Sequence, residues 1–163
     1  MPNYDQKTLE LLMDGKLPFT QVHKILSSFK DADRFEKMLA ILQERVSYDD
    51  KIIMPYGLHL NIVSKADGER IVKCDCGHEF CEHSINWKLH ANVYVRDTEE
   101  KINEIYPKYM GTDPNWMVLR EFYCPNCFTM LEVEAVPPGY PFTFDFQPDI
   151  DTFYQEWLNK PAP

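Results

Sequence analysis

Hydrophobic residues recur at helical spacing through the first fifty residues, and this pattern predicts three short helices. The first ends near Gly15, and the second begins after a Thr20 cap. The third begins at a capping box formed by Asp33 and Glu36. Helices this short need a surface to pack on, and either this chain or a partner protein can provide it.

After the third helix, hydrophobic residues alternate with polar ones, which is the pattern of strands with one buried face. Leu58, Leu60 and Ile62 are predicted to share one face of the first such strand. A hairpin turn is then predicted at Asp67-Gly68, because this pair favours the backbone angles of a tight turn.

The second half of the β-rich region shows the same alternation. The acidic run at 97–100 predicts the start of a helix, which the helix dipole favours. In the last strand, Leu131, Val133 and Ala135 are predicted to point toward one face. The strands predicted in this half span residues 89–95, 116–123 and 128–136.

The composition changes after residue 136. Six of the twelve prolines and seven of the aromatic residues lie between residues 137 and 163. Because proline interrupts strand ladders and helix interiors, this tail is predicted to run extended until a short helix begins near Asp149 or Asp151. Two arrangements remain open: the tail folds back onto its own domain, or it binds a partner, since interfaces concentrate aromatic side chains.

The composition indicates a folded protein. With 163 residues and 44% hydrophobic residues, the chain suits one domain with flanking arms and excludes disorder throughout. Its hydrophobic runs are far shorter than the ~18–20 residues that span a bilayer, and its start lacks the pattern of a signal peptide. We therefore expect a soluble, cytoplasmic protein without a membrane partner.

The charge argues against nucleic acid as a partner. The 17 basic and 26 acidic residues give a formal net charge of −9. A negative chain is repelled by phosphate backbones and by anionic lipids.

Four of the five cysteines form the strongest local signal. Cys74 and Cys76 precede Cys124 and Cys127, and each pair falls in a turn between predicted strands. Two such pairs can place four sulfurs tetrahedrally around one zinc ion, at about 2.3 Å from each. The cytosol keeps thiols reduced, so a metal site is favoured over disulfides. We predict that these four residues hold a structural zinc ion, and we assign no catalytic or cofactor-binding residue.

The first pair is less regular than the second, because only one residue separates its cysteines. His78, Cys81 and His83 are therefore candidates to replace one member of the set, with His78 the first of them. A mixed set could leave a coordination position open, as catalytic zinc sites do. Four thiolates also suit iron, as in rubredoxin. A closed structural zinc site remains the favoured interpretation.

Together these patterns predict an α+β fold with a zinc-ribbon-like antiparallel β core. The expected organisation is an N-terminal helical segment at 1–50, a zinc-binding β-rich domain at 51–136 and an extended interaction arm, rich in proline and aromatic residues, at 137–163.

Motifs of known enzyme classes are absent from the sequence, which contains no nucleophile elbow, glycine-rich phosphate loop or paired-acid signature. Two other functions remain as alternatives. The chain could be a zinc-ribbon module of a nucleic-acid or transcription complex, which its acidity disfavours. It could also be an independent enzyme that uses Cys81 or His78 as nucleophile or base.

The sequence resembles the gamma subunit family of acetone carboxylase. The similarity runs from the third predicted helix nearly to the end of the chain. It is carried by the segments ILQERVSYDDKIIMP (41–55), KCDCGHEFC (73–81), NWKLHANVYVRDT (86–98), EIYP (104–107), REFYCPNC (120–127), LEVEAVPPGYP (131–141) and DFQPDIDTFYQEWL (145–158).

The resemblance implies a role in a heteromeric cytoplasmic enzyme with two alpha, two beta and two gamma chains. Such an enzyme uses ATP to join bicarbonate to acetone, and it yields acetoacetate, AMP and phosphate. The resemblance further implies that ATP and manganese bind to the large alpha and beta subunits. The gamma subunit is then a small, zinc-bearing and non-catalytic chain. Related acetophenone carboxylases share the cysteine pattern, so the ketone stays open.

Overall fold

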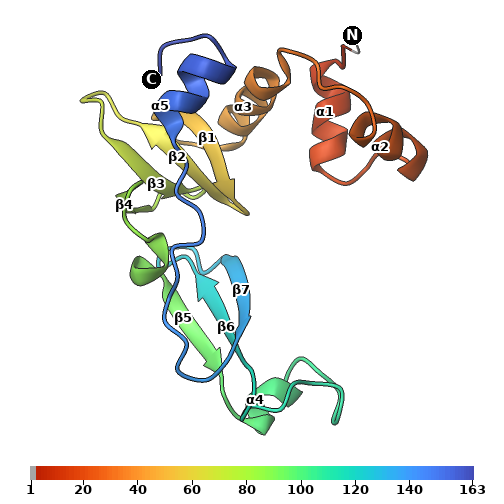
Figure 1. Cartoon of the computed structure of the whole chain (residues 1–163), viewed down its shortest axis with the longest axis vertical. Coiled ribbons are helices and arrows are strands. Elements are labelled where there is room, and N and C mark those ends of the chain that lie inside the picture. The colour runs from red at the N-terminus through yellow and green to blue at the C-terminus, as the bar shows by residue number, and fades with distance from the viewer. Residues whose placement is uncertain (1–2) are drawn as a thin grey trace.

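Two antiparallel sheets lie end to end in the computed structural model, which describes residues 3–163 (Figure 1). Each sheet is a meander, with its strands adjacent in sequence order. The first sheet contains β1 (Lys51–Gly57), β2 (Leu60–Ser64), β3 (Arg70–Cys74) and β4 (Glu79–Glu82). The second sheet contains β5 (Asn92–Arg96), β6 (Val118–Tyr123) and β7 (Met130–Val136). The helices and antiparallel sheets confirm the predicted α+β class.

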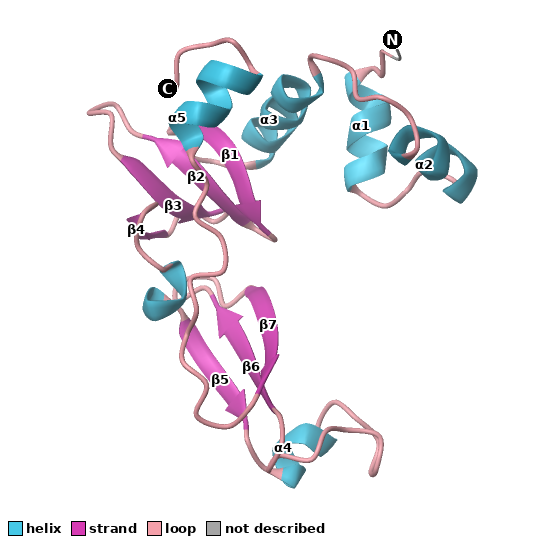
Figure 2. Cartoon of the chain, in the orientation of Figure 1, coloured by secondary structure: helices cyan, strands magenta, loops and turns pink. Residues whose placement is uncertain are grey.

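Most of the helices lie at the end of the molecule formed by the first sheet (Figure 2). The N-terminal helices are α1 (Gln6–Met13), α2 (Phe19–Leu26) and α3 (Arg34–Arg45). Leu39 and Leu42 of α3 pack against a buried cluster of Ile52, Val63 and Ile71 in the first sheet. The helix α1 contacts α3, and α2 follows beyond α1, away from the sheets. This chain therefore provides the packing surface for α3 and, through α3, for α1.

Two of the predicted helix caps are wrong. The helix α2 begins at Phe19 with Pro18 at the N-cap, so Thr20 lies inside the helix. Asp33 does occupy the N-cap of α3, but its side chain accepts no capping hydrogen bond. Its carboxylate lies 2.9 Å from Lys37 Nζ instead. An ion pair one turn into the helix thus replaces the predicted capping box.

The connection between β1 and β2 is a tight turn that the sequence pattern concealed. Gly57 pairs with Leu60, so Leu58 and His59 form the turn. The φ angle of His59 is +59°, in the left-handed region that favours glycine. The prediction that Leu58 shares a strand face with Leu60 and Ile62 is therefore wrong, because the chain reverses between them. The hairpin predicted between β2 and β3 is confirmed.

A single hydrophobic core runs through the junction of the two sheets. The 3-10 helix η1 (Trp87–His90) connects the sheets and places Trp87 between Phe80 of β4 and Phe122 of β6. The ring centroids are 5.9 Å and 5.8 Å apart, in the edge-to-face arrangement that aromatic pairs prefer. All three rings are buried in one cluster, so the two sheets share it.

After Leu131, which is buried in the core, the side of β7 that is turned toward the protein is the polar one. Glu132 and Glu134 are half-buried because Lys88 and Arg120 lie on their side of the sheet and form ion pairs with them. Val133, on the opposite side, is 48% exposed. The predicted alternation is present, but of its hydrophobic side only Leu131 is buried, whereas Val133 and Ala135 are exposed.

The C-terminal arm, residues 137–163, folds back along both sheets (blue in Figure 1). Against the second sheet, the guanidinium of Arg120 donates a hydrogen bond to the carbonyl of Pro141 at 3.4 Å. Near the junction, the hydroxyl of Tyr56 donates to the carbonyl of Phe146 at 2.7 Å. Of the two arrangements that the sequence left open, the structure has the arm packed on its own chain.

The arm ends in a short helix on the first sheet. The helix α5 (Ile150–Thr152) starts after Asp149, whose side chain caps it, in agreement with the predicted start. It continues as a π-helical turn, η2 (Phe153–Trp157). The hydroxyl of Tyr154 donates a hydrogen bond to the carbonyl of Ile53 at 2.7 Å, which ties this helix to β1.

The remaining helix, α4 (Glu99–Asn103), lies at the far end of the second sheet (Figure 1). It starts in the predicted acidic run, and the side chain of Thr98 caps it by accepting a hydrogen bond from the Lys101 N–H. Within residues 3–163, no helix has the length and hydrophobicity needed to cross a membrane.

Candidate metal centre

The two cysteine pairs lie in the turns of two hairpins, one from each sheet. Cys74 ends β3, and Cys76 follows in the turn that leads to β4. Cys124 and Cys127 lie in the turn that joins β6 to β7. The two hairpins meet at the junction of the sheets, where Cys74 and Cys124 belong to the buried core cluster.

The four sulfur atoms form a compact group, with all of them within 4.8 Å of one another. The Sγ atoms of Cys74 and Cys127 are 3.8 Å apart, and those of Cys76 and Cys124 are 3.7 Å apart. A disulfide would bring two sulfurs to about 2.05 Å. In a tetrahedron with metal–sulfur bonds of about 2.3 Å, neighbouring sulfurs are about 3.8 Å apart. The cysteine cluster can therefore hold a metal ion.

The backbone of the first turn is folded tightly enough to aim both sulfurs at one point. The N–H of Cys74 donates to the carbonyl of His78 at 2.9 Å, and the N–H of Gly77 donates to the carbonyl of Cys74 at 2.8 Å. The φ angle of Gly77 is +92°, which glycine adopts without the steric cost that other residues incur. Although only one residue separates Cys74 from Cys76, both lie in one turn, as the sequence predicted.

The second turn has an equivalent set of backbone hydrogen bonds. The N–H of Cys124 donates to the carbonyl of Thr129, and the N–H of Phe128 donates to the carbonyl of Cys124, both at 3.0 Å. Phe128 takes a φ of +58°, although it is not glycine. The left-handed region is unfavourable for a residue with a side chain such as this, so the turn stores local strain.

Polar side chains contact the two exposed sulfurs. The amide of Asn126 donates to Cys76 Sγ at 3.6 Å, and Cys127 Sγ lies 3.3 Å from Thr129 Oγ1. When Cys127 is a thiolate, the hydroxyl and the N–H of Thr129 donate hydrogen bonds to it, which lowers the pKa of Cys127 to about 6. Hydrogen bonds to ligand sulfurs orient them and tune a bound metal.

The two buried thiols have the opposite electrostatic environment. Burial raises the pKa of Cys74 and of Cys124, because the charged thiolate is poorly solvated there. A cysteine must be deprotonated to bind a metal, and a divalent cation would stabilise the thiolate charge that burial disfavours. Two buried and two exposed sulfurs thus form a donor set that suits a thiophilic cation at the protein surface.

A carboxylate inside the first turn fixes that turn to the β1–β2 hairpin. Asp75 accepts a hydrogen bond from the buried Asn61 amide at 2.8 Å, and its other oxygen lies 2.9 Å from His59 Nδ1. The N–H of Asp75 also donates to the carbonyl of His59 at 3.0 Å. Sequence analysis missed this support, although a polar Asn61 inside a buried strand is the signal that could have revealed it.

The three candidate substitutes lie outside the cysteine group, each with other contacts. The His78 ring packs edge-on against Phe80, with centroids 5.0 Å apart. The thiol of Cys81 donates to the carbonyl of Ile85 at 3.5 Å. His83 Nδ1 lies 2.6 Å from a carboxylate oxygen of Glu82. The structure brings together the four cysteines predicted as ligands and not these three residues.

A second acidic group surrounds the buried ammonium of Lys88. Its Nζ atom lies 2.7 Å from Glu132 Oε1 and also contacts the carboxylates of Glu134 and Asp145. We call these four residues the Lys88 cluster. Because an ammonium already occupies the centre of the three carboxylates, they form a network of salt bridges and not a cation site.

Comparison with known proteins identifies the family. The sequence model of the acetone carboxylase gamma subunit family matches residues 46–158. The acetone carboxylase gamma subunit of Xanthobacter autotrophicus (strain ATCC BAA-1158 / Py2) is 49% identical over 161 residues, which is 98% of this chain and 96% of that protein. The acetophenone carboxylase beta subunit of Aromatoleum aromaticum (strain DSM 19018 / LMG 30748 / EbN1) is 36% identical over 80 residues, 48% of this chain and 62% of that one. The chain therefore belongs to the acetone carboxylase gamma subunit family, as its sequence motifs led us to expect.

Proposed function

We propose that this chain is the non-catalytic, zinc-binding gamma subunit of an ATP-dependent acetone carboxylase. The complex would convert acetone, bicarbonate and ATP into acetoacetate, AMP and phosphate in the cytoplasm. Similarity to a gamma subunit along nearly the whole chain supports this proposal. ATP and manganese would bind to the alpha and beta subunits, in a complex with two copies of each chain.

The single observation that carries the proposed role is the all-sulfur donor set of Cys74, Cys76, Cys124 and Cys127. Four thiolates complete the tetrahedral coordination of zinc and leave no position for substrate or water. Zinc bound there supplies a structural cross-link. Because each hairpin contributes two ligands, these residues would join the two sheets and stabilise their junction. We therefore propose a role in stability and assembly for this subunit.

The three segments of the chain would have separate tasks in that complex. We propose residues 51–136 as the zinc-binding domain and residues 1–50 as a helical segment. Residues 137–163 would act as an interaction arm. Several aromatic side chains of the arm remain exposed although it folds back, including Phe146 and Trp157. Exposed aromatic residues are what protein interfaces use.

The decisive experiment is metal analysis of the native complex. A tagged full-length chain is purified with its partners, and zinc, iron and manganese are measured by inorganic mass spectrometry. We expect one zinc ion per copy of this chain and two larger subunits in the same complex. Purification of this chain as a metal-free monomer would refute the proposal.

A matched pair of cysteine variants tests the role of the site. Cys124→Ser removes one proposed ligand, so we expect loss of zinc and of assembly. Cys81→Ser changes a thiol outside the group, and we expect it to retain both. If the other subunits carboxylate acetone at the full rate without this chain, its role in assembly is excluded.

A further inference from the structure

The end of the molecule farthest from the N-terminal helices carries an exposed hydrophobic surface. It lies on the segment between α4 and β6, residues 104–117, which we call the tip (Figure 1). Tyr109 is 86% exposed, Trp116 79% and Met110 73%. Ile105, Tyr106 and Met117 are also exposed. Tryptophan, tyrosine and methionine are enriched in the centres of protein interfaces.

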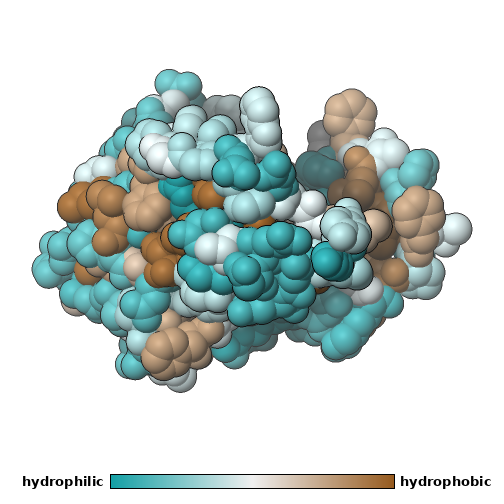
Figure 3. All heavy atoms as spheres, turned by 90° about the horizontal axis from the view of Figure 1, so that it is seen from below, coloured by the Kyte–Doolittle hydropathy of each residue, from teal (hydrophilic) through white to brown (hydrophobic). Residues whose placement is uncertain are grey.

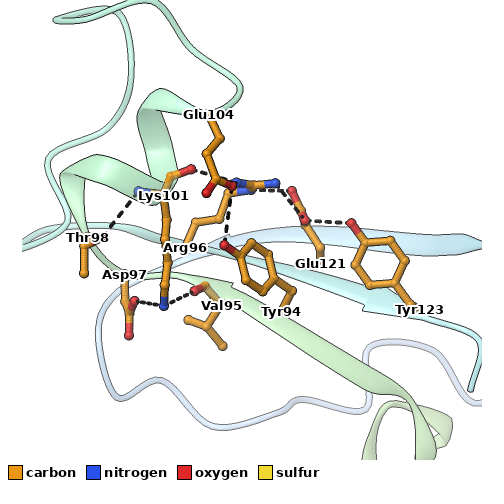
Figure 4. Close-up of polar contacts among 9 residues, drawn as sticks. All are labelled: Tyr94, Val95, Arg96, Asp97, Thr98, Lys101, Glu104, Glu121 and Tyr123. Carbon is orange, nitrogen blue, oxygen red and sulfur yellow. Dashed lines mark hydrogen bonds and ion pairs between the residues drawn. The ribbon is translucent and has the colours of Figure 1, made fainter. Parts of the chain in front are cut away.

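A buried ion-pair network fixes the tip to the second sheet, as Figure 4 shows. Arg96 Nε donates to the buried carboxylate of Glu121 at 2.6 Å. Its Nη1 atom donates to Glu104 at 2.6 Å and to the carbonyl of Lys101 at 2.7 Å. One guanidinium thus joins β5, β6 and the end of α4. The hydroxyl of Tyr123 donates to the far oxygen of Glu121 at 2.7 Å and completes the network.

Close packing inside the tip restricts it further. Ile102 of α4 is almost completely buried. Gly111 lies directly against it, and a Cβ atom at position 111 would overlap the Cγ2 atom of Ile102. The hydroxyl of Thr112 donates to the carbonyl of Met117 at 3.2 Å, across the base of the loop. A surface that is already ordered loses little conformational entropy on binding, so its exposed side chains contribute more to affinity.

The charge on this surface is negative. Exposed acidic side chains lie on α4, at Glu99 and Glu100, and within the tip itself, at Asp113. The two nearby lysines are engaged by this chain: Lys101 Nζ lies 2.7 Å from Asp97, and Lys108 Nζ lies 5.0 Å from the centre of the Tyr109 ring. A complementary surface therefore has a hydrophobic pocket with basic side chains at its rim. A second copy of this chain, with a net charge of −9, is a poor match.

The C-terminal arm does not cover the tip. It crosses the second sheet near Arg120 and then runs toward the first sheet, away from α4 (Figure 1). Figure 3 views the molecule from the α4 end and shows hydrophobic residues at the surface between hydrophilic ones. The exposed aromatic residues of the tip are therefore available to another protein.

We propose that the tip docks into a hydrophobic pocket with a basic rim on another subunit of the carboxylase. This inference rests on the proposed function, because it requires that this chain assemble with such subunits. Trp116 and Tyr109 are the central contacts, and the acidic side chains guide the encounter.

Photo-crosslinking from the native complex tests where the tip binds. Benzoylphenylalanine, a photoreactive amino acid, replaces Trp116 in the full-length chain, and the assembled complex is irradiated. We expect a crosslink to another subunit, at a peptide that contains hydrophobic and basic residues. An intact complex that gives no crosslink, or a crosslink only to a second copy of this chain, overturns the proposal.

Binding measurements give the strength of the contact. The labelled full-length chain is titrated into the other subunits, with Trp116→Ala compared with Leu89→Ala, which alters an exposed hydrophobic residue outside the tip. We expect Trp116→Ala to bind about 30-fold more weakly and the control within about threefold. A weakening of less than about tenfold overturns the proposal. If even the unaltered chain does not bind, the proposed function itself fails, which separates the two outcomes.

Discussion

Replacement of Lys88 with methionine is predicted to destabilise the fold strongly, because it removes the cation from the Lys88 cluster. The lysine side chain is only 3% exposed, and its Nζ atom contacts three carboxylates. Burial opposes its charge, but the hydrogen bonds that it donates to Asp145, Glu132 and Glu134 outweigh burial and raise its pKa. Methionine fills a similar volume and leaves three like charges together.

The expected decrease in the free energy of unfolding depends on how exposed the three carboxylates are. Removal of one partner from a fully buried ion pair costs about 3–5 kcal/mol. Here the Glu134 side chain is 11% exposed, whereas Asp145 is 55% exposed and retains much of its hydration. We therefore expect a value near the lower limit, about 3 kcal/mol. For a chain of this length, that lowers the melting temperature by about 6–12 °C.

The assay is urea unfolding of the full-length chain at neutral pH, followed by far-ultraviolet circular dichroism. Lys24→Met, at an exposed position on α2, is the control and is expected to stay within about 0.5 kcal/mol of the unaltered chain. Adding Asp145→Asn to Lys88→Met removes one of the three neighbouring negative charges. The free energy of unfolding of the double variant should therefore fall by less than the sum of the decreases in the two single variants. The reasoning is refuted if the free energy of unfolding of Lys88→Met lies within about 0.5 kcal/mol of that of the unaltered chain.

Three further predictions concern other parts of the chain. Gly111→Ala should cost about 1–3 kcal/mol, because the added methyl group overlaps Ile102, and an unchanged urea midpoint would contradict this. Burial raises the pKa of Cys81 to about 11, so little of this thiol is deprotonated at pH 8. Its alkylation by iodoacetamide at pH 8, followed by peptide mass spectrometry, should be roughly 100-fold slower than that of free cysteine. Equal alkylation rates would disprove the burial argument. The hydrogen bond from Lys88 lowers the pKa of Asp145, so this carboxylate stabilises the fold above its unfolded pKa of about 4 and loses that effect as the pH falls through its folded value. In urea unfolding, the free energy of unfolding of Asp145→Asn should therefore be lower than that of the unaltered chain at pH 6, and the two values should become equal in acid. A difference in this free energy that persists at low pH would count against this assignment.

Local periodicity was sufficient to predict the element types, and ligand chemistry was sufficient to predict the cysteine cluster. Each of these depends on residues that are close in sequence, or on a ligand chemistry that is specific enough to link distant pairs. The pairs at Cys74 and Cys124 are fifty residues apart, and only the chemistry of thiolates connects them in the sequence. The structure then places their sulfurs in one group.

Features that depend on contacts between distant residues could not be predicted. The polar inner side of β7 exists because Lys88, 46 residues before Glu134, is buried beside it. The position of the arm depends on the contact between Tyr56 and Phe146, which are 90 residues apart. No periodicity contains this information. The turn at His59 was missed for a different reason, since a histidine occupies backbone angles that normally identify glycine.

The location of the cysteine cluster links the proposed metal binding to the proposed role in assembly. The four cysteines lie where the two sheets meet, together with the Trp87 and Phe122 rings. The tip lies beyond the second sheet, and the N-terminal helices lie beside the first (Figure 1). Each hairpin has its own ladder of hydrogen bonds, so loss of the proposed metal ion would act first on the angle between the sheets. That angle sets the separation and orientation of the tip and the N-terminal helices. A partner that contacts both would bind more weakly if the angle changed.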